Sequence, residues 1–299
     1  MTKPKSAARR GQRKPSDPSR LIAFQGSPGA YSDMACRAAY PDMTTLPCLT
    51  FEDTFAAVQE GRAQLAMIPV ENSSAGRVAD IHHLMPESGL HIIAEHFQKI
   101  DHQLLAPKGA TLKTIREVHS HEQALSQCRR FIRAEGLSPV TKADTAGSAA
   151  AIAALGDTKY AAIASALAAE VYDLKVLKRD IQDIPDNTTR FLIMSKEPVD
   201  PDPAEGLVVT TFVFRVRSVP AALYKALGGF ATNGVNLTKL ESYILDGHFT
   251  VAQFYADIEG HPDERLVRLA LEELSFFSRE VRILGVYLAH PFRQTAAKK

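Results

Sequence analysis

The stretch DIPDNTTRFLIM, residues 183 to 194, places two hydroxyls and an arginine directly before an apolar run. Thr189 supplies a hydroxyl that can donate a hydrogen bond, and Arg190 can bind a carboxylate with both arms of its guanidinium. Because a threonine hydroxyl is a weak acid, polarisation or relay from a better acid must assist it. The pair predicts an anion-binding site at the start of a buried strand.

Arg190 also has a structural interpretation. Neighbouring residues of an extended strand point to opposite faces, so Thr189 and Arg190 enter one cleft only where the backbone is irregular. In the alternative, Arg190 pairs with a structural acid such as Asp186 or Glu71. The next residue, Phe191, is expected in the core or in the wall of a pocket.

Other polar residues stand where predicted strands end or predicted helices begin. Asn72, Ser73 and Ser74 follow the apolar strand AMIPVE at its carboxyl end, where ligands of α/β proteins gather, although turn formation is their alternative role. In GSPGAYS, Pro28 suits the first position of a helix whose free N–H groups attract a carboxylate, with Ser27 as its cap.

The second half of this region contributes three more candidates. Ser120 follows the short predicted strand EVH, and Gln127 lies two helical turns later if a helix begins near His121. Thr145 opens ADTAG before a predicted helix, where it either caps the helix or contacts a substrate. The histidines lack the spacing and the third ligand that a metal site needs, so no metal is expected.

The elements that must position these residues alternate along the chain. From Leu21 onward, short apolar runs alternate with helical patterns, which indicates βα units on a largely parallel sheet. Residues 90 to 107 read as long strands that lead into a second lobe, and the strand NTTRFLIMS can return to the first. Residues 183 to 191 then lie near the hinge, where ligands commonly bind.

A different pattern follows a linker rich in proline and acid. The order βαββαβ, with a hairpin turn predicted at Asp246-Gly247, is the ferredoxin-like arrangement of an α+β domain. The expected organisation is a disordered basic tail (1–20), a two-lobed α/β domain (21–197) with one lobe at about 21–99 and 181–197 and the other at about 100–180, a linker (198–206), the α+β domain (207–292) and a tail (293–299).

Composition excludes several classes of function. Lys plus Arg (35) and Asp plus Glu (34) nearly cancel, so no overall field favours nucleic acid or a membrane surface. No apolar run approaches the roughly eighteen residues that span a bilayer. Three separated cysteines fit a reducing cytosol, and the basic first twenty residues lack a signal-peptide core. We therefore expect a cytoplasmic protein.

Five ordered motifs resemble the prephenate dehydratase family: GSPGAYS (26–32), IPVENSSAG (68–76), HSHEQALSQC (119–128), ADTAGSAA (143–150) and NTTRF (187–191). The C-terminal part resembles the ACT regulatory domain, and the resemblance covers nearly everything from Leu21 to Phe292. It implies a carbon–oxygen lyase of phenylalanine biosynthesis that converts prephenate to phenylpyruvate, water and carbon dioxide. It also implies a two-lobed, periplasmic-binding-protein-like catalytic domain with neither metal nor organic cofactor.

The resemblance assigns roles to individual residues. Thr189, the threonine before Arg-Phe, is the implied catalytic residue, placed to hydrogen-bond the leaving hydroxyl. Ser120 and Gln127 are implied to bind substrate. The resemblance also favours substrate binding over turn formation for Asn72 and, to a lesser degree, for Ser73. The expected substrate site comprises Asn72, Ser73, Ser120, Gln127, Thr145, Arg190 and Phe191.

The C-terminal domain departs from the family at two places. Where many members have Gly-Ala-Leu and Glu-Ser-Arg-Pro, this chain has Ala221-Ala222-Leu223 and Glu241-Ser242-Tyr243-Ile244, which bears on its affinity for the implied effector, L-phenylalanine. Ferredoxin-like sheets commonly join edge to edge, so a homodimer or homotetramer is expected. The expected effector residues are Ala222, Leu223, Asn233, Gly234, Asn236, Leu237, Glu241 and Ser242.

Three functions fit the sequence. They are prephenate dehydratase, arogenate dehydratase, which acts on the corresponding amine, and a small-molecule sensor without catalysis. The retained hydroxyl of Thr189 and the pair Ser120 and Gln127 argue against the sensor. The sequence does not choose between the ketone and the amine substrate.

Overall fold

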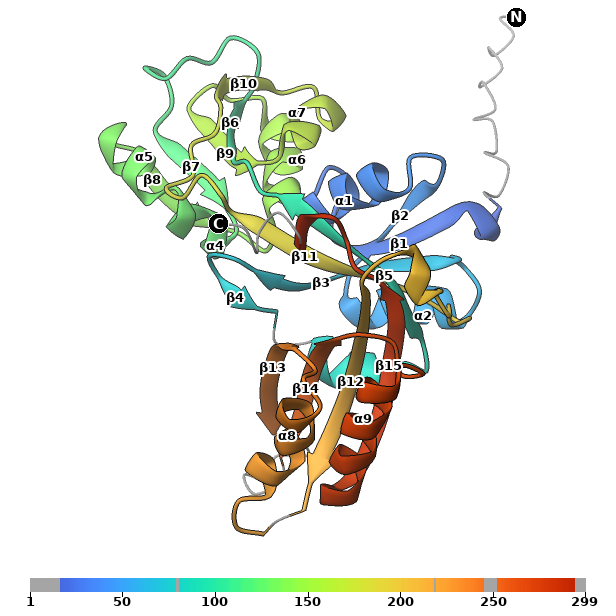
Figure 1. The fold of residues 1–299 in the computed structure, drawn as a ribbon. Helices are drawn as coiled ribbons and strands as arrows, with labels where there is room; N and C mark the ends of the chain where they lie inside the picture. Colours follow the sequence, from blue (N-terminus) through green and yellow to red (C-terminus); the bar gives the residue numbers. More distant parts are fainter. Residues whose placement is uncertain (1–16, 79–80, 218, 245–251, 294–299) are drawn as a thin grey trace, which may run out of the picture.

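Two β-sheets organise the chain (Figure 1). The computed structural model describes residues 17–78, 81–217, 219–244 and 252–293. The predicted hairpin turn at Asp246-Gly247 and most of the two terminal tails lie outside these ranges. Within them, the expected basic tail ends in a short 3-10 helix, Pro18–Arg20. No helix of the described ranges is long and apolar enough to cross a bilayer.

The first lobe is built on part of the larger sheet. Its strands lie in the order β5 (His91–Lys99), β11 (Thr188–Ser195), β3 (Leu65–Asn72), β1 (Leu21–Gln25) and β2 (Thr44–Cys48). Strand β11 returns to this lobe as predicted and lies antiparallel to both β3 and β5. The lobe also contains α1 (Tyr31–Ala39), α2 (Phe51–Gln59), α3 (Ile81–Glu87) and the short strand β4 (Gly76–Arg77).

The prediction for GSPGAYS was wrong in its details. Helix α1 begins at Tyr31 with Ala30 as N-cap and without a side-chain cap bond, so Pro28 is not its first residue and Ser27 does not cap it. Gly29 instead adopts a positive φ of 85°, and a Cβ there would lie 2.8 Å from the Cα of Ala168 in the second lobe. The segment is therefore a turn pressed against the other lobe.

The second lobe has the smaller sheet. Its strand order is β10 (Lys175–Lys178), β6 (Gln103–Ala106), β9 (Tyr160–Ala164), β7 (Glu117–Ser120) and β8 (Ser138–Thr141). Four helices accompany it: α4 (Glu122–Gln127), α5 (Arg129–Ala134), α6 (Thr145–Leu155) and α7 (Ala166–Val171). Helix α6 is capped by Asp144, whose side chain accepts from the Gly147 N–H, and not by Thr145.

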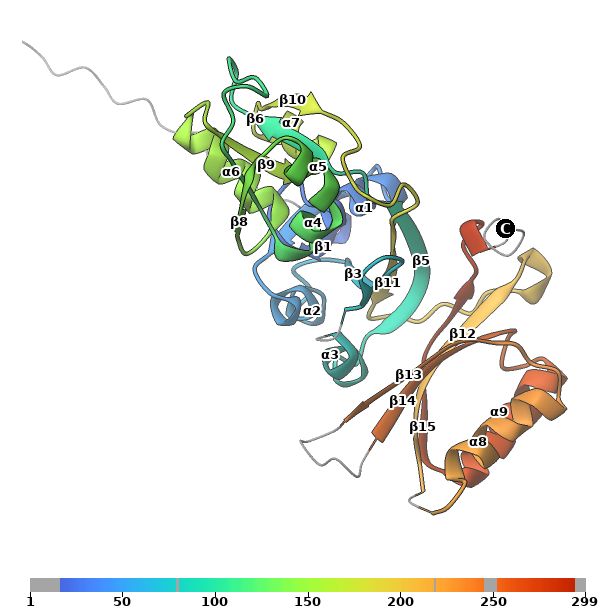
Figure 2. The ribbon, with the colours of Figure 1, turned by 90° about the vertical axis from the view of Figure 1, so that its left-hand side faces the viewer.

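The C-terminal domain has the predicted βαββαβ order. Its elements are β12 (Val208–Val216), α8 (Ala222–Thr232), β13 (Leu237–Ile244), β14 (Ala252–Glu259), α9 (Arg265–Phe277) and β15 (Ser278–Leu288), preceded by a 3-10 turn at Pro203–Glu205. Figure 2 shows α8 and α9 on the face of this sheet that is turned away from the other two lobes. The α/β two-lobed fold followed by a ferredoxin-like domain is confirmed.

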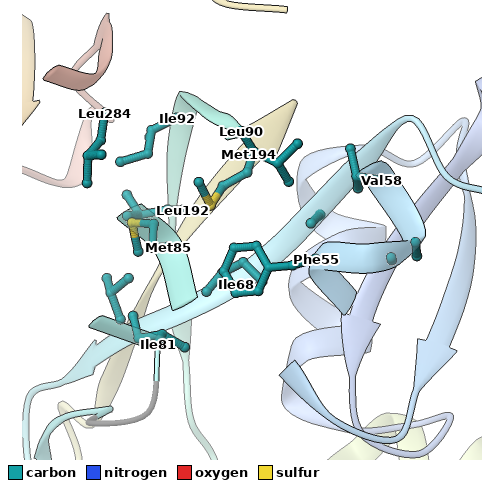
Figure 3. Close-up of a cluster of buried hydrophobic side chains, with 14 of the residues drawn as sticks. Phe55, Val58, Ile68, Ile81, Met85, Leu90, Ile92, Leu192, Met194 and Leu284 are labelled. Atoms are coloured by element: carbon teal, nitrogen blue, oxygen red, sulfur yellow. The ribbon is translucent and has the colours of Figure 1, made fainter. Parts of the chain in front are cut away.

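The C-terminal sheet is not a separate sheet, because β15 pairs with β5 through Gly285 and Ile92. A Cβ at Gly285 would lie 2.2 Å from the Ile92 carbonyl oxygen, so only glycine permits this approach. Leu284 lies beside Ile92 and near Met85 of α3 in the hydrophobic cluster of Figure 3. The C-terminal domain therefore shares both a sheet and a core with the first lobe.

Candidate active site

Asn72 and Thr189 face each other across β3 and β11. Asn72 Nδ2 donates to Thr189 Oγ1 at 2.9 Å. The orientation of this amide is fixed, because its Oδ1 accepts from the backbone N–H groups of Ser74 (3.0 Å) and Ala75 (2.9 Å), which can only donate. Thr189 therefore accepts from Asn72 and keeps its own hydrogen for another acceptor.

The same amide orients two further side chains. Asn72 Nδ2 also donates to Asn187 Oδ1 at 2.7 Å, so the Nδ2 of Asn187 must be the atom that donates to Gln127 Oε1 at 3.1 Å. Asn187 stands just before β11, and Gln127 ends α4 of the second lobe. One chain of hydrogen bonds thus crosses from the first lobe to the second.

His102 and Tyr31 complete this chain. His102 Nε2 lies 2.8 Å from Gln127 Oε1, an acceptor, so Nε2 carries a hydrogen. Nδ1 then accepts from the Tyr31 hydroxyl at 2.7 Å, which is closer than the second acceptor of that hydroxyl, the Asp101 carbonyl at 3.1 Å. Burial lowers the pKa of His102, which favours this neutral form. Burial also raises the pKa of Tyr31 well above its usual range, so the phenol stays a donor. Two backbone amides of the first lobe thus determine the histidine tautomer.

A pocket of about 260 Å³ opens beside this chain. Gln127 and Asn187 line it together with Arg129, whose exposed guanidinium has no hydrogen bond or ion pair to any described residue. Thr189 is not among the residues that line this pocket and is 9% exposed. The pocket therefore presents amide groups and an unpaired cation next to one carboxylate, that of Asp183, which accepts from the Arg130 backbone N–H at 3.1 Å. The amides and the cation can bind an anion.

Two predicted substrate residues, Ser120 and Ser73, make hydrogen bonds that hold the fold, and a third, Thr145, lies apart from the other candidates. Ser120 is fully buried and donates to the Ile163 carbonyl at 2.6 Å, away from the chain of amides. Ser73 Oγ accepts from the Thr188 N–H at 2.9 Å, so it holds the start of β11. Thr145 is the first residue of α6 and makes no described contact with the other candidates. Of the predicted set, Asn72, Gln127 and Thr189 are brought together.

Arg190 pairs with acidic side chains of the protein, as its structural interpretation predicted. Its guanidinium is 3% exposed and binds Glu95 (2.8 Å), Glu71 (3.1 Å) and Asp257 (2.6 Å). Glu71 is one of the two acids expected as structural partners, and the side-chain contacts of Arg190 with Glu71, Glu95, Asp257 and Tyr287 lie away from the hydrogen-bonded amides. Phe191 is 1% exposed in a cluster with Phe24 and is core, not a pocket wall. Neither residue is retained as a substrate ligand.

Several of the expected effector residues make hydrogen bonds within the protein. Asn233 bonds the Gly229 carbonyl, and Asn236 bonds Glu259. Glu241 instead binds Lys239, and the Ser242 carbonyl accepts from Arg77 of the first lobe. A pocket of about 560 Å³ includes only Gly234 of the eight.

Sequence reasoning did not single out His102, Tyr31, Asn187 or Arg129. Asn187 and Tyr31 stand inside NTTRF and GSPGAYS, two of the motifs, so the motifs contained their signal. His102 became visible only through its contacts with Tyr31 and Gln127, and Arg129 only through its place in the pocket lining. Within the described ranges, no group of three or more His, Cys, Asp or Glu residues is placed to hold a metal ion.

Comparison with known proteins decides the family, because the prephenate dehydratase family model matches residues 22–199. The chain belongs to the prephenate dehydratase family. It is 55% identical over 276 residues to a bifunctional N-acyl-homoserine lactone acylase/prephenate dehydratase of Komagataeibacter europaeus, covering 92% of this chain and 98% of that one. It is 38% identical over 275 residues to arogenate dehydratase/prephenate dehydratase 2 of Arabidopsis thaliana, covering 89% and 72%.

A solved member of the prephenate dehydratase family has a closely similar fold. The Arthrobacter aurescens prephenate dehydratase, crystallised in complex with L-Phe, matches with a TM-score of 0.80 and 32% identity, covering 90% of this chain and 89% of that one. The family model ends at residue 199, so the likeness of the C-terminal domain rests on such whole-chain matches.

Proposed function

We propose that this protein converts prephenate to phenylpyruvate. In this reaction the bond from the ring to its carboxylate breaks and releases carbon dioxide, the electron pair restores aromaticity, and the ring hydroxyl leaves with a proton as water. The observation that carries the proposal is the fixed orientation of Asn72, which leaves the Thr189 hydrogen free for the departing oxygen.

Thr189 acts by polarisation in this proposal. His102 is the titratable side chain of the hydrogen-bond chain nearest to it, and three carboxamides separate them. Carboxamides do not readily pass on protons, so a relay along this chain is a poor proton source. A donated hydrogen bond to the leaving oxygen, in a site closed to water, stabilises the charge that develops there.

Arg129 takes the place first given to Arg190. Prephenate is a dianion, and Arg129 is the cation in the lining of the pocket beside Gln127 and Asn187. Thr189 is outside that lining and only 9% exposed, so we infer that the lobes part for substrate to reach it. Contacts that open in this motion are the Tyr172 hydroxyl on the Pro28 carbonyl (2.8 Å) and Ser165 on the Gly29 carbonyl (2.5 Å).

The deciding experiment supplies the purified protein with prephenate and, separately, with arogenate. Formation of phenylpyruvate supports the proposal, phenylalanine from arogenate assigns the amine substrate, and absence of both products refutes dehydration. Thr189→Ala is expected to lower kcat about a hundredfold, whereas Thr189→Ser retains most of it because the hydroxyl remains. Circular dichroism confirms that both variants fold.

A second activity is suggested by one relative. The Komagataeibacter europaeus protein, 55% identical over 92% of this chain, is also named an N-acyl-homoserine lactone acylase. We propose amide cleavage of such lactones as a second reaction, to be followed as release of homoserine lactone. Loss of both activities in Thr189→Ala places them in one site, and no release from any chain length refutes the second reaction.

We also propose that the enzyme acts in the cytoplasm as a homodimer or homotetramer regulated by L-phenylalanine. Among the described strands, β13 lies at one edge of the larger sheet, which supports edge-to-edge association of two copies. Sedimentation with and without L-phenylalanine, alongside inhibition kinetics, tests assembly and effector together.

A further inference from the structure

Two adjacent residue pairs of β3 and β11 bond to different parts of the protein. Asn72 pairs with Thr189, and the next pair along the ladder is Glu71 with Arg190. Asn72 and Thr189 bond each other within the chain of amides, whereas Glu71 and Arg190 bond residues of the C-terminal domain. The register is irregular immediately afterwards, between Arg190 and Phe191. Ladder hydrogen bonds alone therefore hold this point less firmly than the rest of the strand.

Two charged side chains and one hydroxyl of the C-terminal domain bind Glu71 and Arg190. Asp257 of β14 accepts from Arg190 Nη1 at 2.6 Å, and the Tyr287 hydroxyl of β15 accepts from Nη2 at 2.9 Å. Lys239 of β13 donates to Glu71 Oε2 at 2.6 Å. Asp257 and Tyr287 are fully buried, and the Lys239 side chain is 9% exposed. Such contacts are strong and weakly screened.

The charge states support a fixed arrangement. Burial by itself raises the pKa of Asp257, but Arg190 and the Thr211 hydroxyl outweigh it and hold that pKa below its ordinary value. Lys239 donates a second bond, to Glu241 at 2.6 Å, and His82 Nε2 lies 3.1 Å from the other oxygen of that carboxylate. Burial raises the pKa of Glu241, yet His82 and Lys239 lower it to about 2. The carboxylates of Asp257 and Glu241 thus stay charged at neutral pH.

We propose that Lys239 and Asp257, which belong to the C-terminal domain, are positioning residues of the dehydratase site in the same chain. They hold Glu71 and Arg190, and through the backbone of these residues they fix the distance between Asn72 and Thr189. This inference rests on the proposed function. It makes the C-terminal domain a structural part of the active site in addition to any regulatory role.

The mechanism is geometric. A displacement of residue 71 or 190 shifts its neighbour on the same strand, and the Asn72 to Thr189 bond at 2.9 Å tolerates little displacement. Substrate binding in this proposal depends on groups of the second lobe, such as Gln127 and Arg129. The ion pairs of Lys239 and Asp257 with Glu71 and Arg190 do not include these groups. Loss of a positioning residue therefore lowers kcat more than it raises KM.

The test uses the full-length protein. Lys239→Met removes the bonds to Glu71 and Glu241, and we expect kcat on prephenate to fall about tenfold while KM changes less than about twofold. Lys239→Arg keeps the charge and restores most of kcat. Arg215→Gln, which breaks an ion pair with Glu280 elsewhere in the same domain, is the matched control and keeps the wild-type kcat.

A double variant separates positioning from general destabilisation. Glu71→Gln carries the test if Lys239→Met does not fold, because the Glu71 side chain is 34% exposed and the change is isosteric. The combination of Glu71→Gln and Lys239→Met is expected to be no slower than the slower single variant, since both act through one contact. Rates are taken per folded protein, from circular dichroism at the assay temperature.

Three outcomes overturn the inference. They are a wild-type kcat in folded Lys239→Met, a loss that merely follows the folded fraction, and strictly multiplicative effects in the double variant. These outcomes require that the wild-type protein turns over prephenate or arogenate. A wild-type protein inactive on both substrates instead refutes the proposed function, and the inference falls with it.

Discussion

Asn72 donates to Thr189 in a direction that cannot reverse. If this amide were flipped, its Nδ2 would face the N–H groups of Ser74 and Ala75, which are donors themselves, and two hydrogen bonds would be lost. Thr189 therefore acts as an acceptor towards Asn72 and as a donor towards whatever enters the cleft. The direction of one hydrogen bond thus sets the chemical role of the hydroxyl.

Replacement of Asn72 tests this direction. In Asn72→Asp the introduced carboxylate still accepts from the two backbone amides, but its second oxygen faces Thr189 and takes the hydroxyl hydrogen from the substrate. We expect kcat to fall about a hundredfold, further than in Asn72→Ala, which loses the bond but leaves that hydrogen free. Steady-state kinetics on prephenate give the order, and an alanine variant slower than the aspartate variant contradicts the assignment.

His102 offers a test that needs no substrate. The hydrogen-bond chain predicts the neutral tautomer with hydrogen on Nε2, which ¹⁵N NMR of histidine-labelled protein reports directly. The resonance is assigned by its absence in His102→Gln. A hydrogen on Nδ1 at neutral pH would show that the amide chain runs in the opposite direction.

The lowered pKa of His102 gives a pH dependence with a definite sign. Below the ordinary value of 6.5 the unfolded chain binds a proton at this position, whereas burial keeps the folded ring neutral until lower pH. The stability that this histidine contributes is thus present above pH 6.5 and is lost as pH falls through the folded pKa. Urea unfolding midpoints across this range are expected to fall less steeply in His102→Gln than in the wild type.

Arg129 should affect binding and not chemistry. Its guanidinium lines the pocket and has no ion pair to any described residue, so a dianion gains a contact without first breaking one. Arg129→Gln is expected to raise KM for prephenate about tenfold with kcat within about twofold. Arg130→Gln changes the adjacent exposed arginine, which does not line the pocket, and should leave both constants unchanged. Equal effects of the two variants would indicate general electrostatic attraction.

Periodicity and motif order were sufficient for most of the fold. The alternation of apolar runs and helical patterns predicted the two-lobed α/β arrangement, and the return of β11 to the first lobe followed from its late position. Strand β10 was missed, because KVLK is short and ends in lysines at both sides. The joining of β15 to β5 was also missed, since one glycine in an apolar strand does not reveal which backbone approaches it.

The candidate site was predicted in part, and the reason lies in side-chain direction. The sequence placed Asn72, Gln127 and Thr189 correctly near one another, but it left open whether Arg190 shares the face of Thr189. Strand alternation favoured opposite faces, and the structure follows it. Arg190 could not be assigned from sequence because Asp257 and Tyr287, two of its partners, stand 67 and 97 positions away.

Ala221 has a backbone conformation with a measurable cost. Its φ is 61°, in the left-handed region that disfavours any residue with a Cβ. Ala221→Gly is therefore expected to stabilise the protein by about 1 kcal/mol, read as a higher urea midpoint. Ala222→Gly is the control, because residue 222 begins α8 and glycine there lowers stability. A loss of stability in Ala221→Gly would mean that the greater freedom of glycine in the unfolded chain outweighs the relief of strain.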